Sequence, residues 1–177
     1  IVGGNLGMVG APLLAARAAL RLGAGRVYLD CIGAAGLRLD PQQPELMFRP
    51  LAGLDGLTAC VIGCGLGEDD AARGALTAAL ASPCPLIIDA DALNLLGADA
   101  TLAQRCLARQ ADTVLTPPPL EAARLLGTAA APVQQDRLGH ALELARRLRA
   151  TAVLKGAGTV VAGVDGQNQQ RDSRDVD

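Results

Sequence analysis

The sequence predicts a layered α/β domain with a mostly parallel sheet flanked by helices, and three observations lead to this prediction. Short apolar runs alternate with helical segments along most of the 177 residues, which is the pattern of strand–helix–strand units. Glycine, proline or acidic residues follow most of the apolar runs, as turns between such units require. Half of the residues are hydrophobic, but Tyr28 and Phe48 are the only aromatic ones. The core must therefore consist of small aliphatic side chains, which suit close packing of helices on a sheet.

In the first half of the chain, the pattern predicts three strands separated by turns and helices. A strand ends at Ile1–Gly4, and a helix follows from about Ala11 to Leu22, with Pro12 tolerated in its first turn. Glycines directly after Leu22 stop this helix. The other elements expected here are the strand Arg26–Ile32, irregular structure over 33–56, the strand Leu57–Gly63 and a helix beginning near Asp69 or Asp70.

In the second half, the same alternation continues and predicts a single domain over residues 1–166. A long amphipathic helix is expected over Val133–Ala150, because apolar residues recur on one of its faces. Residues 167–177 contain one aliphatic residue and no periodicity, so we expect a disordered tail there. The other expected elements are the strands Pro85–Asp89, Asp112–Thr116, Thr151–Lys155 and Thr159–Ala162, and the helices Ala92–Leu96, Leu102–Gln110 and Glu121–Leu126.

Charge and composition exclude several functional classes. The formal net charge is -2, so we expect no basic surface for nucleic acid, and two aromatic residues cannot form a base-stacking platform. No apolar stretch approaches the ~20 residues that a membrane span needs. The opening Ile1-Val2-Gly3-Gly4 also begins many trypsin-like proteases, but the sequence has one histidine, His140, and no Gly-Asp-Ser-Gly. A protease triad therefore cannot be assembled.

The cysteines indicate a reducing compartment. They are five in number, irregularly spaced and without a Cys-x-x-Cys pair, so neither a zinc site nor a disulfide framework is expected. Most of them lie in apolar runs, where a free thiol behaves as a small hydrophobic group. We therefore expect reduced thiols in a cytoplasmic protein.

Lys155 is the only lysine in the sequence, and it stands at a strand end directly before Gly156-Ala157-Gly158-Thr159. Glycines let backbone N–H groups approach a ligand closely, and a compact ammonium group suits a phosphate. This segment therefore predicts contact with a phosphate or a nucleotide, although it is not a Walker A loop because the lysine precedes the glycines. The alternative is a tight hairpin with a solvated lysine.

Two further strand ends carry residues that suit a binding site. Gly63-x-Gly65-x-Gly67 lies between a strand and a helix and predicts either anion binding at the helix N-terminus or a turn with an acidic cap. Asp89 and Asp91 follow an apolar strand and would lie on one side of it. They would organise a metal or a polar substrate group, or Asp91 would cap the next helix. Ligands of parallel α/β sheets bind at such strand ends.

Taken in order, these segments resemble the ADP-dependent NAD(P)H-hydrate dehydratases, a branch of the ribokinase-like superfamily related to carbohydrate kinases. The resemblance spans residues 1 to about 166 and implies a ribokinase-like fold. The matching motifs are Gly-Met-Val-Gly-Ala, Gly23-Ala24-Gly25-Arg26-Val27, Pro44-Glu45-Leu46-Met47, Gly63–Gly67, Asp89–Leu96, Thr116–Gly127 and Lys155–Thr159.

The resemblance implies a lyase that repairs hydrated nicotinamide cofactors. In this family a nucleotide passes a phosphoryl group to the hydroxyl of hydrated NADH or NADPH, and elimination of phosphate restores the cofactor. The donor is ADP or ATP, and Mg²⁺ is compatible with this chemistry. By position, the segment Lys155, Gly156, Ala157, Gly158 and Thr159 would hold the nucleotide. The hydrated nicotinamide would lie against Ala11 and Gly65, with Asp89 and Asn94 nearby.

The sequence departs from the family pattern in two places. Pro118 replaces a histidine that would contact substrate, and a Gly-Thr/Ser-Gly-Asp segment with the catalytic base does not occur. We therefore expect a fold that is incomplete at its C-terminus, impaired turnover and no assigned catalytic residue. The closing helices that would cover one sheet face are not predicted either, so a homo-oligomer is expected. A small-molecule kinase of the same fold, or a non-catalytic remnant or partner-dependent subunit, remain alternatives.

Overall fold

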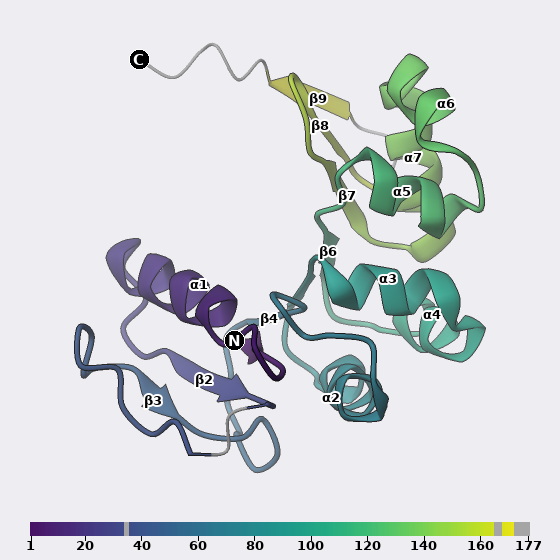
Figure 1. Cartoon of the computed structure of the whole chain (residues 1–177). Helices are drawn as coiled ribbons and strands as arrows, with labels where there is room; N and C mark the ends of the chain where they lie inside the picture. Colours follow the sequence, from purple (N-terminus) through teal and green to yellow (C-terminus); the bar gives the residue numbers. More distant parts are fainter. Residues whose placement is uncertain (34–35, 165–167, 172–177) are drawn as a thin grey trace.

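The computed structural model describes residues 1–33, 36–164 and 168–171, and these residues form one sheet with helices on both faces (Figure 1). The strands are β1 (Val2–Gly3), β2 (Tyr28–Cys31), β3 (Met47–Phe48), β4 (Cys60–Ile62), β5 (Leu86–Ile88), β6 (Thr113–Leu115), β7 (Thr151–Leu154), β8 (Thr159–Ala162) and β9 (Asn168–Arg171). The helices are α1 (Gly10–Arg21), α2 (Asp70–Ala81), α3 (Asp91–Ala98), α4 (Ala100–Leu107), α5 (Pro119–Leu126), α6 (Ala130–Gln135) and α7 (Arg137–Leu148).

The sheet is mostly parallel, which confirms the predicted fold class. Within the described residues the strand order is β3-β2-β1-β4-β5-β6-β7-β8-β9. Strands β1 to β7 run parallel to one another, whereas β8 is antiparallel to β7 and β9 is antiparallel to β8 at one edge. The chain thus winds outward from β1 in two directions, first through β2 and β3 and then through β4 to β7.

The two winding directions place helices on opposite faces of the sheet, because crossover connections between parallel strands are right-handed. Ala16 of α1 packs with Leu29 in a small hydrophobic cluster, whereas Leu76 of α2 packs with Ile62 and Ile88 in the large one. Figure 1 shows α1 beside β2 and the other helices along β4 to β7. The direction reverses between β1 and β4, and ligands of such sheets bind at the carboxyl ends of the strands there.

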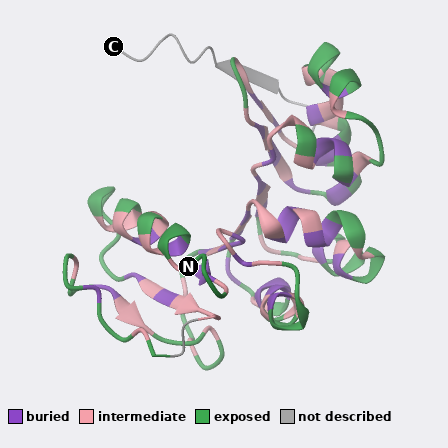
Figure 2. Ribbon diagram, viewed as in Figure 1, coloured by how far each residue is buried: buried purple, intermediate pink, exposed green. Residues whose placement is uncertain are grey.

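Within the described residues, the face of the sheet that carries α1 is incompletely covered beyond β1. On β4 to β8, fully buried residues alternate with partly exposed ones (Figure 2). The partly exposed positions point away from the large core and include Thr151, which pairs with Val114, and Thr159; the apolar ones, called here the apolar row, are Val61, Ile87, Val114, Val153 and Val161. Strands of a parallel sheet are normally buried on both faces, and α1 packs on β1 and β2.

Two stretches that were predicted as irregular contain strands. Met47–Phe48 forms β3 inside 33–56, and Asn168–Arg171 forms β9, so the expected tail is wrong over these four residues. Residues 167 and 172–177 of that tail lie outside the described residues. Strand β9 pairs with β8 through backbone hydrogen bonds, which polar residues make as well as apolar ones. No apolar periodicity was therefore available to indicate it.

The long helix predicted over Val133–Ala150 is also wrong, because the structure divides it at Asp136. There the backbone leaves the helical conformation, with φ of −129°, and the Asp136 carboxylate accepts a hydrogen bond of 2.9 Å from the Gly139 N–H. An aspartate that caps a new helix in this way competes with continuation of the old one. Leu138 is consequently exposed, and Leu144 fills the core.

Helix lengths and polarity also bear on the membrane prediction. Among the described residues, no helix combines the length and the apolar character that crossing a bilayer demands.

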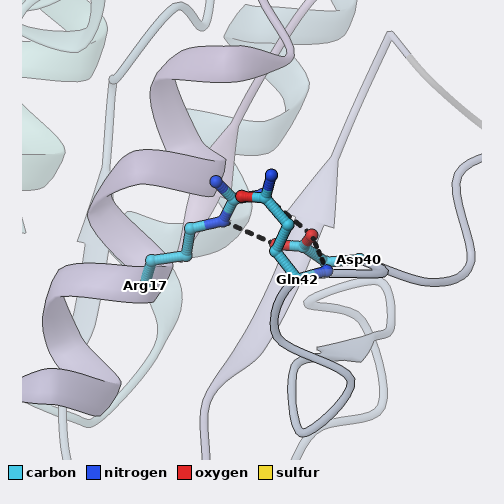
Figure 3. A network of polar contacts seen from close by, with 3 residues as sticks. All are labelled: Arg17, Asp40 and Gln42. Carbon is cyan, nitrogen blue, oxygen red and sulfur yellow. Dashed lines mark hydrogen bonds and ion pairs between the residues drawn. The ribbon is translucent and has the colours of Figure 1, made fainter.

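An ion pair fastens α1 to the loop before β3 (Figure 3). Arg17 donates two hydrogen bonds to Asp40, from Nε to Oδ2 at 2.7 Å and from Nη2 to Oδ1 at 2.8 Å. The Gln42 N–H adds a third donor to Oδ1 at 3.0 Å. Asp40 is buried, with 3% of its surface exposed. The hydrogen bonds from Arg17 lower the pKa of the Asp40 carboxyl below its ordinary value.

This lowered pKa predicts a loss of stability in acid. A carboxylate with a depressed pKa stabilises the fold above its unfolded pKa of about 4 and loses that contribution as the pH falls through the folded value. We expect the Asp40→Asn variant to melt at a lower temperature at neutral pH, and the difference from wild type to shrink towards about pH 3. Thermal unfolding across this range measures both. Asp55→Asn, at an exposed site, serves as the control. A constant difference at all pH values would contradict the prediction.

Candidate functional site

Most of the predicted site residues lie on loops at one edge of the sheet, whereas Ala11, Asn94 and Thr159 lie in α1, α3 and β8. These loops follow the carboxyl ends of five adjacent parallel strands, β1, β4, β5, β6 and β7. The backbone ties the loops together: the Gly4 N–H donates to the Cys64 carbonyl at 3.1 Å, and the Lys155 N–H donates to the Pro117 carbonyl at 2.9 Å. Segments that are far apart in the sequence therefore form one continuous surface, as expected for strands that start their loops at the same edge.

An ion pair between Lys155 and Asp89 lies at the centre of this surface. Lys155 Nζ is 2.7 Å from Asp89 Oδ1, and the side chains are 44% and 26% exposed. Two predicted site residues from separate strand ends, 66 positions apart in the sequence, are thus in direct contact. The hairpin of the alternative interpretation exists, because β7 and β8 are antiparallel. Its lysine, however, is paired and directed at a neighbouring loop.

The loop after Lys155 offers backbone donors. Gly156 and Gly158 have φ of +152° and +75°, conformations that favour glycine. Within the described residues, the N–H groups of Gly156, Ala157 and Gly158 have no hydrogen-bond acceptor in the protein. Thr159 opens β8, and its hydroxyl donates to the Gly156 carbonyl at 3.3 Å. Consecutive N–H groups without partners, beside an ammonium group, can hold an anion such as a phosphate.

Gly65 and Ala11 are neighbours, as the resemblance implies. Gly65 has φ of +61°, and a Cβ atom there would lie 2.8 Å from the Met8 carbonyl oxygen and 3.3 Å from the Ala11 Cβ. The loop after β4 therefore packs directly on the start of α1. Only a residue without a side chain permits this approach, so the glycine shapes the surface between β1 and β4.

The glycine-rich turn after β4 is held by carboxylates. The Gly67 N–H donates to Asp91 Oδ2 at 2.8 Å, and Asp69 caps α2 by accepting from the Ala72 N–H at 2.9 Å. These contacts favour the turn with an acidic cap over anion binding at this helix N-terminus. Asp91 makes no side-chain cap of its own helix α3; instead it fixes the turn. Within the described residues, no group of three or more metal-ligating side chains occurs.

Asn94 contacts a neighbouring helix through its side chain. It lies in α3, and its side-chain oxygen accepts a hydrogen bond of 2.7 Å from Arg124 of α5. This contact joins two helices of the outer layer. The structure therefore brings together Lys155 with Asp89 and Gly65 with Ala11, and it links Asn94 to α5.

Sequence reasoning did not assign a role to Glu121 or Cys64, which lie close to the ion pair. Burial raises the pKa of Glu121, the charge of Lys155 opposes this rise and that of Asp89 adds to it. Glu121 Oε2 is buried without a hydrogen-bond partner among the described residues. Burial likewise raises the pKa of the Cys64 thiol, with a further contribution from Asp89. The position of Glu121 in the first turn of α5, the helix that follows β6, was the one signal that could have indicated it.

A cavity of about 390 Å³ lies elsewhere, at the amino ends of β1, β2 and β4. It is lined by Arg26, Tyr28, Asp30 and Arg49 among others. None of the predicted site residues contributes to it, so this cavity and the candidate site are separate features.

Known proteins with similar sequences share one family description. A family model described as NAD(P)H-hydrate dehydratase matches residues 1–172. The ADP-dependent (S)-NAD(P)H-hydrate dehydratase of Neisseria meningitidis is 44% identical over 93% of this chain and 57% of its own length. The bifunctional NAD(P)H-hydrate repair enzyme of Coxiella burnetii is 38% identical over 91% of this chain and 33% of its own length.

A solved structure shows the same fold. The ADP/ATP-dependent NAD(P)H-hydrate dehydratase of Bacillus subtilis, co-crystallised with ATP and Mg²⁺ and soaked with CoA, superposes with a TM-score of 0.76 and 29% identity. The match covers 96% of this chain and 63% of that one, so the chain spans about three fifths of the Neisseria and Bacillus relatives and one third of the Coxiella enzyme. The family model, the sequence relatives and the shared fold together establish that the chain belongs to the NAD(P)H-hydrate dehydratase family.

Proposed function

We propose that the chain takes part in the nucleotide-dependent dehydration of hydrated NADH or NADPH. In the proposed reaction, ADP transfers a phosphoryl group to the hydroxyl of the hydrate and leaves as AMP. Loss of inorganic phosphate and a proton from the phosphorylated hydrate then restores NADH or NADPH. The observation that carries this proposal is the Lys155–Asp89 ion pair beside the open N–H groups of Gly156–Gly158, in a chain of this family.

The residues at the strand ends fit a nucleotide phosphate. Lys155 and the N–H groups that follow it would bind phosphate oxygens, because an ammonium and backbone donors both form strong hydrogen bonds with anions. Asp89 holds the ammonium in place before the ligand arrives. The hydrated nicotinamide would lie over Ala11 and Gly65, which pack against each other between β1 and β4, with Asp89 and Asn94 as the other substrate residues.

Mg²⁺ would accompany the nucleotide. Magnesium usually binds through one or two carboxylates together with substrate phosphates and water. Asp91 is engaged by the Gly67 N–H, and Asp89 by Lys155, whereas Glu121 keeps an oxygen without a partner among the described residues. Glu121 is therefore the carboxylate that we propose to meet the metal–phosphate group, whose charge would favour its ionised form.

We propose further that the 177 residues by themselves turn over slowly. The Gly-Thr/Ser-Gly-Asp segment that supplies a base in the family does not occur among them, and Pro118 offers no side-chain hydrogen bond to a substrate. A group that accepts a proton in the transition state typically contributes about 10²–10⁴-fold to a rate. Without such a group, we expect the 177 residues to bind nucleotide and substrate but to catalyse the dehydration slowly.

The test is the recovery of NADH absorbance from hydrated NADH with ADP, ATP or no nucleotide, alongside the Neisseria meningitidis relative as a positive control. We expect recovery that depends on nucleotide and is at least about 100-fold slower than that of the relative. Formation of AMP in step with NADH would identify the phosphoryl donor. Failure to bind ADP or ATP at all would contradict the proposal, and phosphorylation of an alcohol without hydrate repair would favour the kinase alternative.

Assembly and location follow as two further proposals. We propose a homo-oligomer, because a second copy would bury the apolar row, which carries no charged side chain. Light scattering that returned the mass of one chain would contradict it.

A cytoplasmic location is supported by five free cysteines, since disulfides persist in oxidising compartments. Detection of the protein in a secreted or periplasmic fraction would contradict this location.

A further inference from the structure

Arg137, at the start of α7, forms hydrogen bonds with the end of β7 and the loop that follows it. Its Nη2 donates to three carbonyl oxygens of this loop: Leu154 at 2.9 Å, Gly158 at 3.1 Å and Lys155 at 3.3 Å. A Cβ atom at Gly156 would lie 2.8 Å from Arg137 Nη1, so the guanidinium fills the inside of the turn. One side chain thus contacts both ends and the middle of the segment Lys155–Gly158.

These contacts determine which way the loop presents its donors. In a trans peptide the carbonyl and the next N–H point in opposite directions. The Lys155 carbonyl is directed at Arg137, so the Gly156 N–H is directed away from it. The carbonyls of Leu154 and Gly158 are held on the same guanidinium. Removing carbonyl oxygens from the ligand side also removes the partial negative charges that would repel a phosphate.

Arginine suits this task better than other cations. Its guanidinium is planar, carries five N–H donors in a fixed arrangement and stays charged at all relevant pH values. A lysine at this position has three donors on a flexible stem and cannot reproduce the geometry. The charge itself lies directly beneath the loop and adds to the field of Lys155 at any anion bound above it.

We propose that Arg137 is the positioning residue of the nucleotide loop, holding the carbonyls of Leu154, Lys155 and Gly158 inward so that the Gly156 N–H, and none of these three carbonyls, faces the phosphates. This inference rests on the proposed function, because it assigns the loop to a nucleotide. Arg137 does not touch the ligand in this arrangement; it acts through the shape and the charge that it imposes on the loop.

Calorimetric titration of ADP and of adenosine against the Arg137→Lys and Arg137→Gln variants tests the proposal. We expect at least a ten-fold rise in the Kd for ADP in Arg137→Lys and a larger rise in Arg137→Gln, with a change of less than three-fold for adenosine. Arg146→Gln, an exposed arginine on the same helix, is the matched control and should bind ADP like wild type. A merely structural role would instead weaken ADP and adenosine to the same extent.

A measurement on the unaltered chain keeps the test valid if a variant fails to fold. In the ¹⁵N NMR spectrum of wild type, addition of ADP should shift the amide resonances of Gly156, Ala157 and Gly158, and addition of adenosine should not. Unshifted amides at saturating ADP would overturn the inference while leaving nucleotide binding intact. If wild type binds no ADP, the proposed function itself has failed, and so has the inference that rests on it.

Discussion

Replacement of Lys155 by methionine is expected to weaken ADP binding by about 10- to 150-fold, because a hydrogen bond to a charged group contributes about 1.5–3 kcal/mol. Methionine keeps the length and the apolar stem of the side chain but removes the ammonium. The Lys155–Asp89 pair is partly exposed, with 44% and 26% of the side chains accessible, and such pairs contribute little to stability. The variant should therefore fold and melt close to wild type. Isothermal titration with ADP measures the loss.

Asp89→Asn is the matched control for this experiment. It releases the same ammonium group from its partner without removing it, so a phosphate no longer competes with a carboxylate for Lys155. We expect ADP to bind this variant at least as tightly as wild type, whereas Lys155→Met binds it weakly. Equal ADP affinity in wild type and Lys155→Met would show that the nucleotide lies elsewhere, and the proposed function would lose its main support.

Much of the candidate site could be predicted from the sequence because its residues stand at equivalent places in the fold. Lys155, Asp89 and Gly65 all stand where an apolar strand ends, and parallel strands end at the same edge of the sheet. Recognising the strands was therefore enough to place these residues near one another. The hairpin between β7 and β8 followed from the glycines between two β-rich runs, and both of its strands agree with the structure.

The partners of these residues could not be predicted in the same way. Arg137 lies at the start of a helix and resembles any solvated arginine in the sequence, and its role depends on carbonyls that are 17 to 21 residues away. The bond between Asp91 and the Gly67 N–H likewise depends on how two loops cross. Such contacts are set by tertiary packing, and neither hydrophobic period nor spacing carries information about them.

The errors in the fold have local physical causes. Asp136 interrupts an apolar pattern that continues on both sides of it, and an aspartate either sits in a helix or caps the next one. Local sequence leaves this choice open, and the packing of Leu144 in place of Leu138 decides it. Strand β9 is polar throughout and is specified by backbone pairing with β8. In both cases the local structure is decided by the elements packed or paired beside the segment rather than by the sequence of the segment itself.

Gly63→Ala is expected to cost about 3 kcal/mol or more of the free energy of unfolding, the largest effect on stability that we predict for a single methyl group. Gly63 has φ of +126°, a conformation that side chains rarely adopt, and a Cβ atom there would overlap the Asp89 carbonyl oxygen and lie 3.0 Å from the Ala92 Cβ. The carbonyl belongs to the backbone directly after β5, so this overlap is relieved only if the loops after β4 and β5 separate. Urea denaturation measures the loss.

Gly74→Ala controls for the change of glycine to alanine. Gly74 is exposed in the interior of α2, and a Cβ atom there meets nothing within 4 Å. Alanine favours a helix over glycine by about 0.5–1 kcal/mol, so this variant should be more stable than wild type. Because the two variants are expected to change stability in opposite directions, the comparison separates the cost of close packing at Gly63 from the intrinsic helix propensity of alanine. Because the displaced carbonyl is that of Asp89, Gly63→Ala should also weaken the ion pair between Asp89 and Lys155. A Gly63→Ala protein with the stability of wild type would mean that the two loops can part freely, and that the close packing after β4 does not hold the site together.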